Sequence, residues 1–383
     1  MTTTDQRIDQ LADALEASGD LSDPTWRRTM HVVPRHLFVP ERGYALPCRY
    51  DLGPAEHVID KAADPEQWWA AVYSDMSIIT QRDDGASDPT DPEGSASSSI
   101  SAPGIVFPFL ELLGPTKGER ILDIGTGTGW TAALLSDRVG AENVTSVEID
   151  PAVAAQAAEN LRAAGHTPTL IVGDGFEGWP QGAPYDGIHV TAGVSDIPHA
   201  WVKQLRPGGR AVMPWMPEGL GGFQVKLTVN PDGHGIGTIH GRAGYMLLRS
   251  QRSSSYWKEH HRGEAQVTTT ELPPKAIEDA GDGAELALIM NVPDLFVIRM
   301  LMGDGTMSYR LAVVGDPDGP WASIDSSPTG ENTVTQYGDR RLWDEAENAF
   351  TWWREKGAPG AERFGLLVTE EGTRLWLDDP PKA

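Results

Sequence analysis

The chain has 383 residues, and its 55 Asp and Glu outnumber its 31 Lys and Arg, which gives a formal net charge of −24 at pH 7. This charge opposes binding to phosphate backbones, so we expect no nucleic acid among the partners. A chain of this length can bury a large core and is expected to form two domains.

Cysteine content and hydropathy bear on the cellular compartment. Cys48 is the single cysteine, which excludes an internal disulfide and any all-cysteine metal site. No N-terminal stretch resembles a signal peptide, and no apolar run approaches the roughly 20 residues that span a bilayer. We therefore expect a cytoplasmic protein without membrane contact. The adjacent His260 and His261 lack further ligands at metal spacing, so no metal is predicted.

The first predicted elements are helical. Between Asp5 and Gly19, apolar residues recur at helical spacing among charged ones, and the glycine ends the pattern. A second helical stretch begins at Pro24. It runs into a segment in which Pro34 and Pro40 favour an extended path.

A glycine loop is the strongest local signal. The apolar stretch 121–124 predicts a buried strand, glycines follow at 125, 127 and 129, and a helix rich in alanine and leucine comes next. Strand, glycine loop and helix form the nucleotide-binding start of an α/β sheet. The G-x-G-x-G spacing departs from the G-x-G-x-x-G of dinucleotide sites and argues against NAD. It is similar to the loop of S-adenosylmethionine-dependent methyltransferases, although a tight turn alone would look the same.

An acidic residue ends the next predicted strand. Glu148 lies about twenty residues beyond the glycine loop, where a carboxylate can accept hydrogen bonds from both ribose hydroxyls of a nucleoside. The alternative is a solvated carboxylate at a strand end.

Several phrases, in the same order, resemble the protein-L-isoaspartate O-methyltransferases. They are 33–40 (Val-Pro-Arg-His-Leu-Phe-Val-Pro), 72–75, 99–103 (Ser-Ile-Ser-Ala-Pro), 123–129, 147–150, 173–175, 179–180 and 205–210. Each phrase is modest evidence, but the ordered set is specific and covers roughly the first 215 residues.

This resemblance implies an α/β fold, a Rossmann-like class I methyltransferase domain with an N-terminal helical segment. It implies S-adenosylmethionine as cofactor and S-adenosylhomocysteine as product. Asp174 is expected to accept from the adenine amine, with a simple turn before Gly175 as the alternative. The expected cofactor-binding residues are Asp123, Gly125, Thr126, Gly127, Gly129, Glu148, Ile149, Asp174, Gly175 and Thr191.

The methyl acceptor is expected to lie near the 99–103 phrase. Ser101 is predicted to cap the helix that begins near residue 105, whose free N–H groups would attract a carboxylate. A carboxylate is already ionised near neutral pH, so catalysis requires orientation rather than a strong base. The expected catalytic residues are Ser101, Ser99 and, by family analogy, Asp75, for which an ordinary turn residue is the alternative. The expected substrate-binding residues are Ala102, Pro103, Gly104 and Pro214.

Two departures from the family concern this region. Residues 83–98 form an insertion rich in Ser, Asp, Pro and Gly, for which we predict a flexible loop, either a plain surface loop or a flap over the site. Gly104 replaces the His or Tyr usual after the active-site proline, which puts substrate contacts there in doubt.

The second half alternates short apolar runs with turn residues and predicts a β-rich module. Its expected strands are 223–229, 236–240, 286–290, 296–300, 311–314 and 374–377. One amphipathic helix is expected over 341–356, with its aromatic residues in the core. The expected segments are 1–82 (N-terminal, helical), 83–98 (flexible insertion), 99–215 (S-adenosylmethionine-binding core) and 216–383 (β-rich, a candidate for peptide recognition).

The C-terminal phrases 363–366 and 375–378 resemble a subgroup associated with ribosomally synthesised peptides, including lanthipeptides and graspetides. This resemblance implies methylation of an ordinary peptide aspartate, followed by formation of an aspartimide and then isoaspartate. Repair of isoaspartyl residues in damaged proteins is the alternative. A protein that keeps the pocket but only binds a partner is a second alternative.

Overall fold

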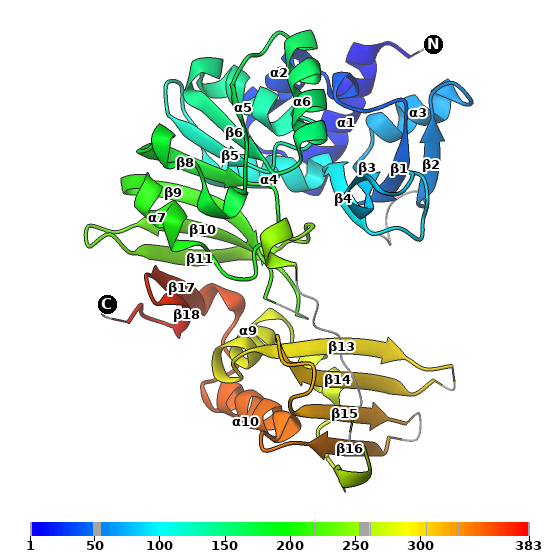
Figure 1. Ribbon diagram of the computed structural model, residues 1–383, viewed down its shortest axis with the longest axis vertical. Helices are drawn as coiled ribbons and strands as arrows, with labels where there is room; N and C mark the ends of the chain where they lie inside the picture. The colour runs from blue at the N-terminus through cyan, green and yellow to red at the C-terminus, as the bar shows by residue number, and fades with distance from the viewer. Residues whose placement is uncertain are drawn as a thin grey trace.

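The computed structural model describes residues 2–48, 55–217, 220–252, 260, 262–303, 305–327 and 330–381. Its centre is a nine-stranded sheet in the order β18-β17-β11-β10-β9-β8-β5-β6-β7 (Figure 1). Five neighbouring strands are parallel: β5 (Ile121–Ile124), β6 (Val144–Glu148), β7 (Thr169–Val172), β8 (Tyr185–Val190) and β9 (Leu205–Trp215). The predicted α/β class I methyltransferase fold is confirmed.

Strand order places the site. Along the chain, β6 and β7 lie on one side of β5, whereas β8 and β9 lie on its other side. Ligands of open α/β sheets bind where the order reverses in this way, beyond the carboxyl ends of the strands. The helices of this part are α4 (Pro103–Leu113), α5 (Trp130–Val139), α6 (Pro151–Ala163) and α7 (His199–Gln204).

The N-terminal part contains more than helices. The helix predicted from Asp5 is α1 (Thr4–Ser18), which Gly19 ends in the left-handed conformation. The other helices are α2 (Pro24–Val32) and α3 (Pro65–Val72). A four-stranded antiparallel sheet joins them, in the order β2-β1-β3-β4. Its strands are β1 (Arg42–Pro47), β2 (His57–Asp60), β3 (Met76–Arg82) and β4 (Ala96–Ile100).

The insertion 83–98 is mostly a loop, as predicted, because residues 86–95 belong to no helix or strand. It begins with the 3-10 turn η2 (Asp83–Gly85) and ends inside β4. The Arg82 guanidinium donates to the carbonyl oxygens of Pro89, at 3.1 Å, and Gly94. The Asp83 carboxylate accepts from the Ser95 N–H at 3.0 Å. Hydrogen bonds between its polar groups therefore hold the segment together, which its composition alone does not predict.

The boundary expected at residue 215 cuts through the central sheet. Strands β10 (Phe223–Val229) and β11 (Gly235–Arg242) continue it from β9, and β17 (Phe364–Thr369) with β18 (Gly372–Leu377) completes that edge. The separate unit is residues 266–355, referred to below as the second module (Figure 1).

The second module contains a five-stranded antiparallel sheet in the order β12-β16-β15-β14-β13. The strands are β12 (Gln266–Thr269), β13 (Leu295–Leu301), β14 (Met307–Val313), β15 (Trp321–Ser326) and β16 (Asn332–Tyr337). The helices are α8 (Pro274–Asp279), α9 (Asp282–Asn291) and α10 (Leu342–Glu355). The strand predicted over 286–290 is wrong, because this buried apolar run belongs to α9 and such short runs fit either state.

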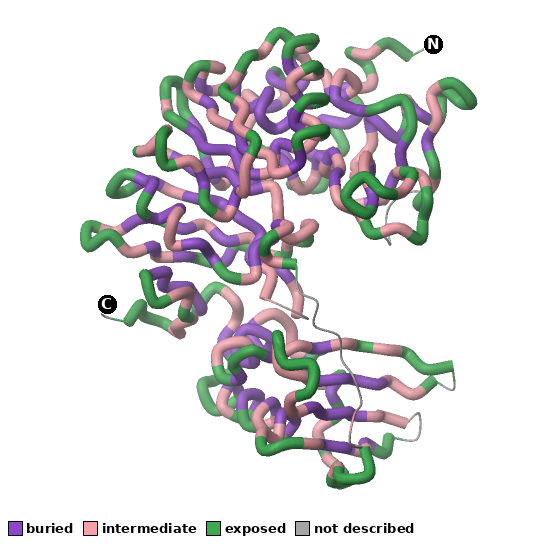
Figure 2. The backbone as a smooth tube through the Cα atoms, in the orientation of Figure 1, coloured by how far each residue is buried: buried purple, intermediate pink, exposed green. Residues whose placement is uncertain are grey.

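One cluster of buried apolar residues joins the nine-stranded sheet to the second module, and another joins the N-terminal part to α4 and α5 (Figure 2). Of the four aromatic residues of α10 predicted to lie in the core, Trp343, Phe350 and Trp353 are buried, whereas Trp352 is only half-buried against them. None of the helices in the described part of the chain combines the length and apolar character that a membrane crossing requires. Short 3-10 turns complete the structure: η1 (Arg35–Leu37), η3 (Ala141–Asn143), η4 (Gly175–Glu177), η5 (Pro180–Gly182), η6 (Arg249–Gln251), η7 (Arg262–Glu264) and η8 (Ala361–Arg363).

Leu366 tests whether the C-terminal hairpin is part of the main core. Its side chain in β17 is 0% exposed, so Leu366→Ala should lower the free energy of unfolding by about 2–5 kcal/mol. The matched control is Leu301→Ala, whose leucine is 72% exposed and should change stability by less than about 0.5 kcal/mol. Urea unfolding followed by tryptophan fluorescence measures both. Equal effects would contradict the placement of β17 in the core.

Candidate functional site

A cavity opens at the carboxyl edge of β5, β6 and β8. Most of the predicted site residues line it: Ser99, Ser101, Gly125, Thr126, Gly127, Glu148, Ile149, Asp174, Gly175 and Thr191. The cavity therefore brings together the expected cofactor residues and the expected catalytic serines, which come from two different sheets.

The glycine loop passes very close to β4. Gly127 has a positive φ of 53°, and a Cβ placed on it would lie 3.2 Å from the carbonyl oxygen of Ser99. Glycine is favoured at Gly127 because a larger residue would strain the backbone and push the loop away from β4. The Gly127 N–H also donates to Glu148 Oε2 at 2.9 Å.

Glu148 lies largely buried at the end of β6. Its Oε1 accepts the Asp150 N–H at 3.1 Å, so each carboxylate oxygen is held by one backbone group. Burial raises the pKa of the Glu148 carboxyl above its usual range, whereas these hydrogen bonds and the charge of Arg249 oppose the rise. An ionised carboxylate offers about four acceptor positions, which leaves room for a pair of hydroxyls.

Asp174 follows β7, the strand next to β6, so it lies on the far side of Glu148 from the glycine loop. Its Oδ1 accepts the Phe176 N–H at 2.9 Å, which is the turn expected from the sequence, and also the Ser250 hydroxyl at 3.1 Å. Two acidic acceptors beside a glycine loop fit the hydroxyls and the amine of a nucleoside cofactor. The turn and the cofactor interpretations of Asp174 are therefore compatible.

Two of the expected cofactor residues lie outside the cavity lining. Asp123 is 0% exposed, and its carboxylate accepts the Ser146 hydroxyl at 2.7 Å and lies 3.1 Å from His189 Nδ1. Ser146 in turn contacts the hydroxyl of Thr126 at 2.7 Å. Asp123 thus supports the loop from beneath. Gly129 begins α5 and faces Leu161 of α6, where it permits close helix packing.

Residues 97–101, which run from β4 into the position after it, line one wall of the cavity. Ser97, Ser98, Ser99 and Ser101 all belong to this wall. The Ser101 side chain also hydrogen-bonds the buried Tyr245, whose pKa burial raises above the usual range for a phenol.

The predicted helix cap at Ser101 is wrong. Helix α4 starts at Pro103 with Ala102 at its N-cap, and the Gly104 N–H donates to Asp75 Oδ1 at 2.6 Å. Asp75 therefore occupies the helix end that was expected to attract a substrate carboxylate, and it lies outside the cavity lining. A Cβ on Gly104 would lie 2.5 Å from Asp75 Oδ2, which explains why a larger residue is absent.

The other residues expected to bind substrate lie away from the cavity wall. Ala102 is 0% exposed, and Pro103 forms the first turn of α4. The Pro214 carbonyl in β9 accepts the Val194 N–H at 2.9 Å. These residues support the site rather than line it.

Arg35 supports the serine strand from beneath and was missed in the sequence. Its guanidinium donates to the carbonyl oxygens of Val72 and Met76, both at 2.7 Å, and of Ser101 at 3.0 Å. Burial lowers the pKa of Arg35 to about 10, so it remains charged at neutral pH. Its place in the Pro-Arg-His phrase was the available signal, but that phrase predicts only a loop.

A strap formed by residues 246–252 covers one side of the cavity. Its lining residues are Met246, Leu247, Leu248, Arg249 and Arg252. Backbone hydrogen bonds join it to Gly193, which donates to the Met246 carbonyl at 2.8 Å and accepts the Leu248 N–H at 2.9 Å. Since the strap lies beyond the phrases that resemble the family, its role could not be inferred from them.

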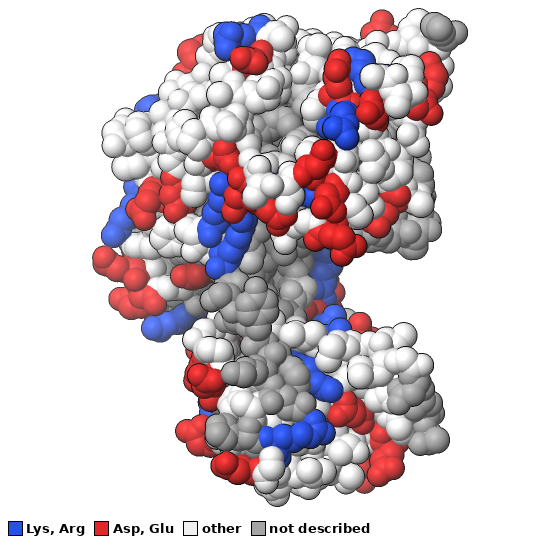
Figure 3. Space-filling view, turned by 45° about the vertical axis from the view of Figure 1, so that its right-hand side comes forward, with Lys and Arg blue, Asp and Glu red and all other residues white. Residues whose placement is uncertain are grey.

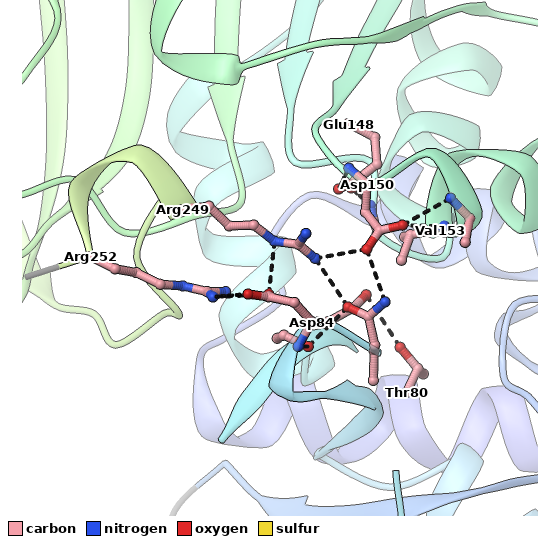
Figure 4. Close-up of polar contacts among 12 residues, drawn as sticks. Thr80, Asp84, Glu148, Asp150, Val153, Arg249 and Arg252 are labelled. Carbon is pink, nitrogen blue, oxygen red and sulfur yellow. Dashed lines mark hydrogen bonds and ion pairs between the residues drawn. The ribbon is translucent and has the colours of Figure 1, made fainter. Parts of the chain in front are cut away.

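Two arginines of the strap meet acidic residues of other elements (Figure 4). Arg249 lies 2.9 Å from Asp150 Oδ2 and 3.0 Å from Asp84 Oδ1. Arg252 approaches Asp84 from another side, with Nη1 at 2.9 Å from both carboxylate oxygens. Burial alone would raise the pKa of Asp150, but hydrogen bonds from Gln81, Arg249 and the N–H groups that begin α6 lower it to about 2.

Across the described ranges, no group of three or more His, Cys, Asp or Glu side chains is arranged to hold a metal ion. His261 lies outside those ranges. In Figure 3, acidic side chains are spread over the visible surface, as the net charge of −24 requires.

Glu148 tests the cofactor assignment. Glu148→Ala should remove two hydrogen bonds from ribose hydroxyls to a charged acceptor, each contributing about 1.5–3 kcal/mol. The affinity for S-adenosylmethionine, measured by calorimetry, should fall accordingly. Glu159→Ala on the exposed face of α6 is the matched control and should bind as the wild type does. Unchanged affinity in Glu148→Ala would refute the ribose assignment.

Comparisons with known proteins agree with this site. The family model described as protein-L-isoaspartate(D-aspartate) O-methyltransferase (PCMT) matches residues 66–237. A protein-L-isoaspartate O-methyltransferase of Thermococcus onnurineus is 44% identical over 163 residues, which are 42% of this chain and 72% of that protein. The relative from Ignicoccus hospitalis is 41% identical over 145 residues, 37% of this chain and 68% of its own length.

A solved structure called protein-L-isoaspartate O-methyltransferase shares the fold. It aligns with a TM-score of 0.54 and 23% identity, over 97% of this chain and all of its own. Protein-L-isoaspartate O-methyltransferase 1 of Archaeoglobus fulgidus is 36% identical over 212 residues, 55% of this chain and 80% of that protein. The chain therefore belongs to the S-adenosylmethionine-dependent protein-L-isoaspartate O-methyltransferase family.

Proposed function

We propose that this chain methylates a carboxylate of an aspartyl-type residue in a peptide or protein. One observation carries the proposal: the acidic acceptors expected to hold a nucleoside cofactor and the serines Ser99 and Ser101 line the same cavity. Gly127 has no side chain between the cofactor residues and the serines, so the methyl donor and the acceptor carboxylate can come into contact there.

Glu148 and Asp174 would hold the ribose and the adenine of S-adenosylmethionine, and the glycine loop would cradle the remainder. When bound, this cofactor supplies an electrophilic methyl group. The serine hydroxyls of Ser99 and Ser101 donate hydrogen bonds that orient the acceptor carboxylate, while the strap excludes water from the side of the cavity that it covers. Because the carboxylate is ionised at neutral pH, no residue has to remove a proton from it.

The names of the relatives support an isoaspartyl residue as acceptor. All the relatives above are called protein-L-isoaspartate O-methyltransferases, and the matched residues 66–237 contain the proposed cofactor contacts and the serine strand. Repair of isoaspartyl residues in damaged proteins is therefore the function that the comparisons favour.

A second candidate is an aspartate of a ribosomally synthesised, modified peptide. The observation in its favour is the second module, residues 266–355, which lies wholly outside the matched range. In this candidate reaction the methylated side chain is attacked by the next backbone nitrogen, which loses its proton. Methanol leaves and an aspartimide forms, which water can open to isoaspartate.

The two acceptors are separated by measuring methyl ester formation by mass spectrometry. One substrate is a short isoaspartyl peptide, and the other is a cyclised precursor peptide with an ordinary aspartate. Turnover of the isoaspartyl peptide alone supports repair, and turnover of the cyclised precursor alone supports peptide modification. If the chain binds S-adenosylmethionine but methylates neither, it is a binding protein and the proposed function fails.

Ser101 tests the orientation of the acceptor. Ser101→Ala should lower kcat by roughly 10- to 100-fold, since one hydrogen bond to a charged group is lost, while the affinity for S-adenosylmethionine stays nearly the same. Ser95→Ala, at an exposed position just before β4, is the control and should keep full turnover. Full activity in Ser101→Ala would leave Ser101 with a purely structural role beside Tyr245.

A further inference from the structure

The carboxylate of Asp84 forms ion pairs with two arginines at the wall of the cavity. Both Arg249 and Arg252 line the cavity, and Asp84 contacts both of them. The two oxygens of Asp84 lie at 2.9 Å from Arg252 Nη1 (Figure 4). Arginine at this distance binds carboxylates strongly and with defined orientation.

The two arginines differ in how they are held. Arg249 keeps Asp150 and Gln81 as partners, at 2.9 and 3.1 Å, even without Asp84. In the described part of the chain, Asp84 is the carboxylate that Arg252 binds. Release of Asp84 would free the Arg252 guanidinium from this carboxylate and allow it to bind another one.

The backbone that presents Asp84 is unfavourable. Asp83 and Asp84 both have positive φ values, 47° and 53°, which cost energy for residues other than glycine. The hydroxyl of Ser97, on the serine wall, accepts the Asp84 N–H at 3.1 Å. The Asp84 side chain is 45% exposed, so solvent or a competing ligand can reach it.

We propose that Arg252 and Arg249 form a binding subsite for an acidic residue of the peptide substrate, and that Asp84 occupies this subsite until the substrate arrives. This inference rests on the proposed function. The substrate carboxylate takes over the two guanidinium contacts, and Asp84 is released to solvent.

The carboxylate bound here is not the one that is methylated. Ser97 and Ser101 are four residues apart along β4 and its extension, which is roughly 13 Å at about 3.3 Å per residue. Asp84, which both arginines hold, donates its N–H to the Ser97 hydroxyl, whereas the acceptor carboxylate is assigned to Ser99 and Ser101. The subsite therefore binds a second acidic side chain of the substrate, up to about four residues from the acceptor in an extended peptide.

The net charge of the chain gives a local cationic subsite a clear effect on acidic substrates. With a formal charge of −24, the chain as a whole repels anionic peptides. A pair of arginines at the cavity wall gives a local attraction and fixes the register of the peptide.

Two synthetic isoaspartyl peptides test the inference. They differ at one position, three residues from the acceptor, which is Glu in one and Gln in the other. The readout is the ratio of kcat/KM for the Glu peptide to that for the Gln peptide. The wild type should prefer the Glu peptide, and Arg252→Gln should bring the ratio close to one.

Asp84→Asn gives the discriminating result. If Asp84 competes with the substrate, this variant should raise the ratio by about tenfold, mainly through a lower KM for the Glu peptide. If Asp84 only fastens the strap, the ratio will stay the same or fall, and the inference is overturned. Asp91→Asn is the control, since this aspartate of the same insertion accepts the Glu93 N–H at 3.0 Å and should leave the ratio unchanged.

Binding distinguishes this failure from failure of the proposed function. Fluorescein-labelled versions of both peptides are titrated with protein and S-adenosylhomocysteine, and Kd is measured by anisotropy. Absence of methylation with a preserved preference for the Glu peptide would refute the reaction but support the subsite. Methylation with equal Kd values for the two peptides would support the reaction and refute the subsite.

Discussion

The fold depends on one close approach, that of the glycine loop to β4. Gly127 leaves no side chain between the loop and the Ser99 carbonyl, so a loop of the parallel sheet and a strand of the N-terminal sheet share one cavity wall. Buried polar groups fix both sides. Asp123 supports the loop through the Ser146 and Thr126 hydroxyls, and Arg35 holds the Ser101 carbonyl. Such groups are costly to leave unpaired, which makes this arrangement specific.

The sequence predicted what local signals encode. The strand, glycine loop and helix, and the place of Glu148, follow from patterns within about thirty residues. The contact of Asp75 with the start of α4 could not be predicted in this way, because Asp75 lies 29 residues from Gly104, whose N–H donates to it. The strap is more distant still, since Arg252 meets Asp84 across 168 residues. Its arginines carry no motif, and only the folded chain shows what they face.

Asp150 links several parts of the site. It caps α6 through the Ala152 and Val153 N–H groups, donates its own N–H to Glu148, and accepts from Gln81 and Arg249. These hydrogen bonds outweigh burial and keep its pKa at about 2, so it stays anionic under ordinary conditions. Asp150 therefore connects Arg249 of the strap to the start of α6 and to Glu148, the residue proposed to hold the ribose.

The second module is inserted in the chain between two paired strands of the nine-stranded sheet, rather than appended after the last one. The chain leaves the nine-stranded sheet at β11, forms the module, and returns as β17, which pairs antiparallel with β11. In an antiparallel pair, the end of one strand lies beside the start of the next. The exit and return points are thus neighbours. A shorter connection that keeps the strap 246–252 would preserve every strand pairing of the nine-stranded sheet, so different modules could be inserted there while that sheet stays intact.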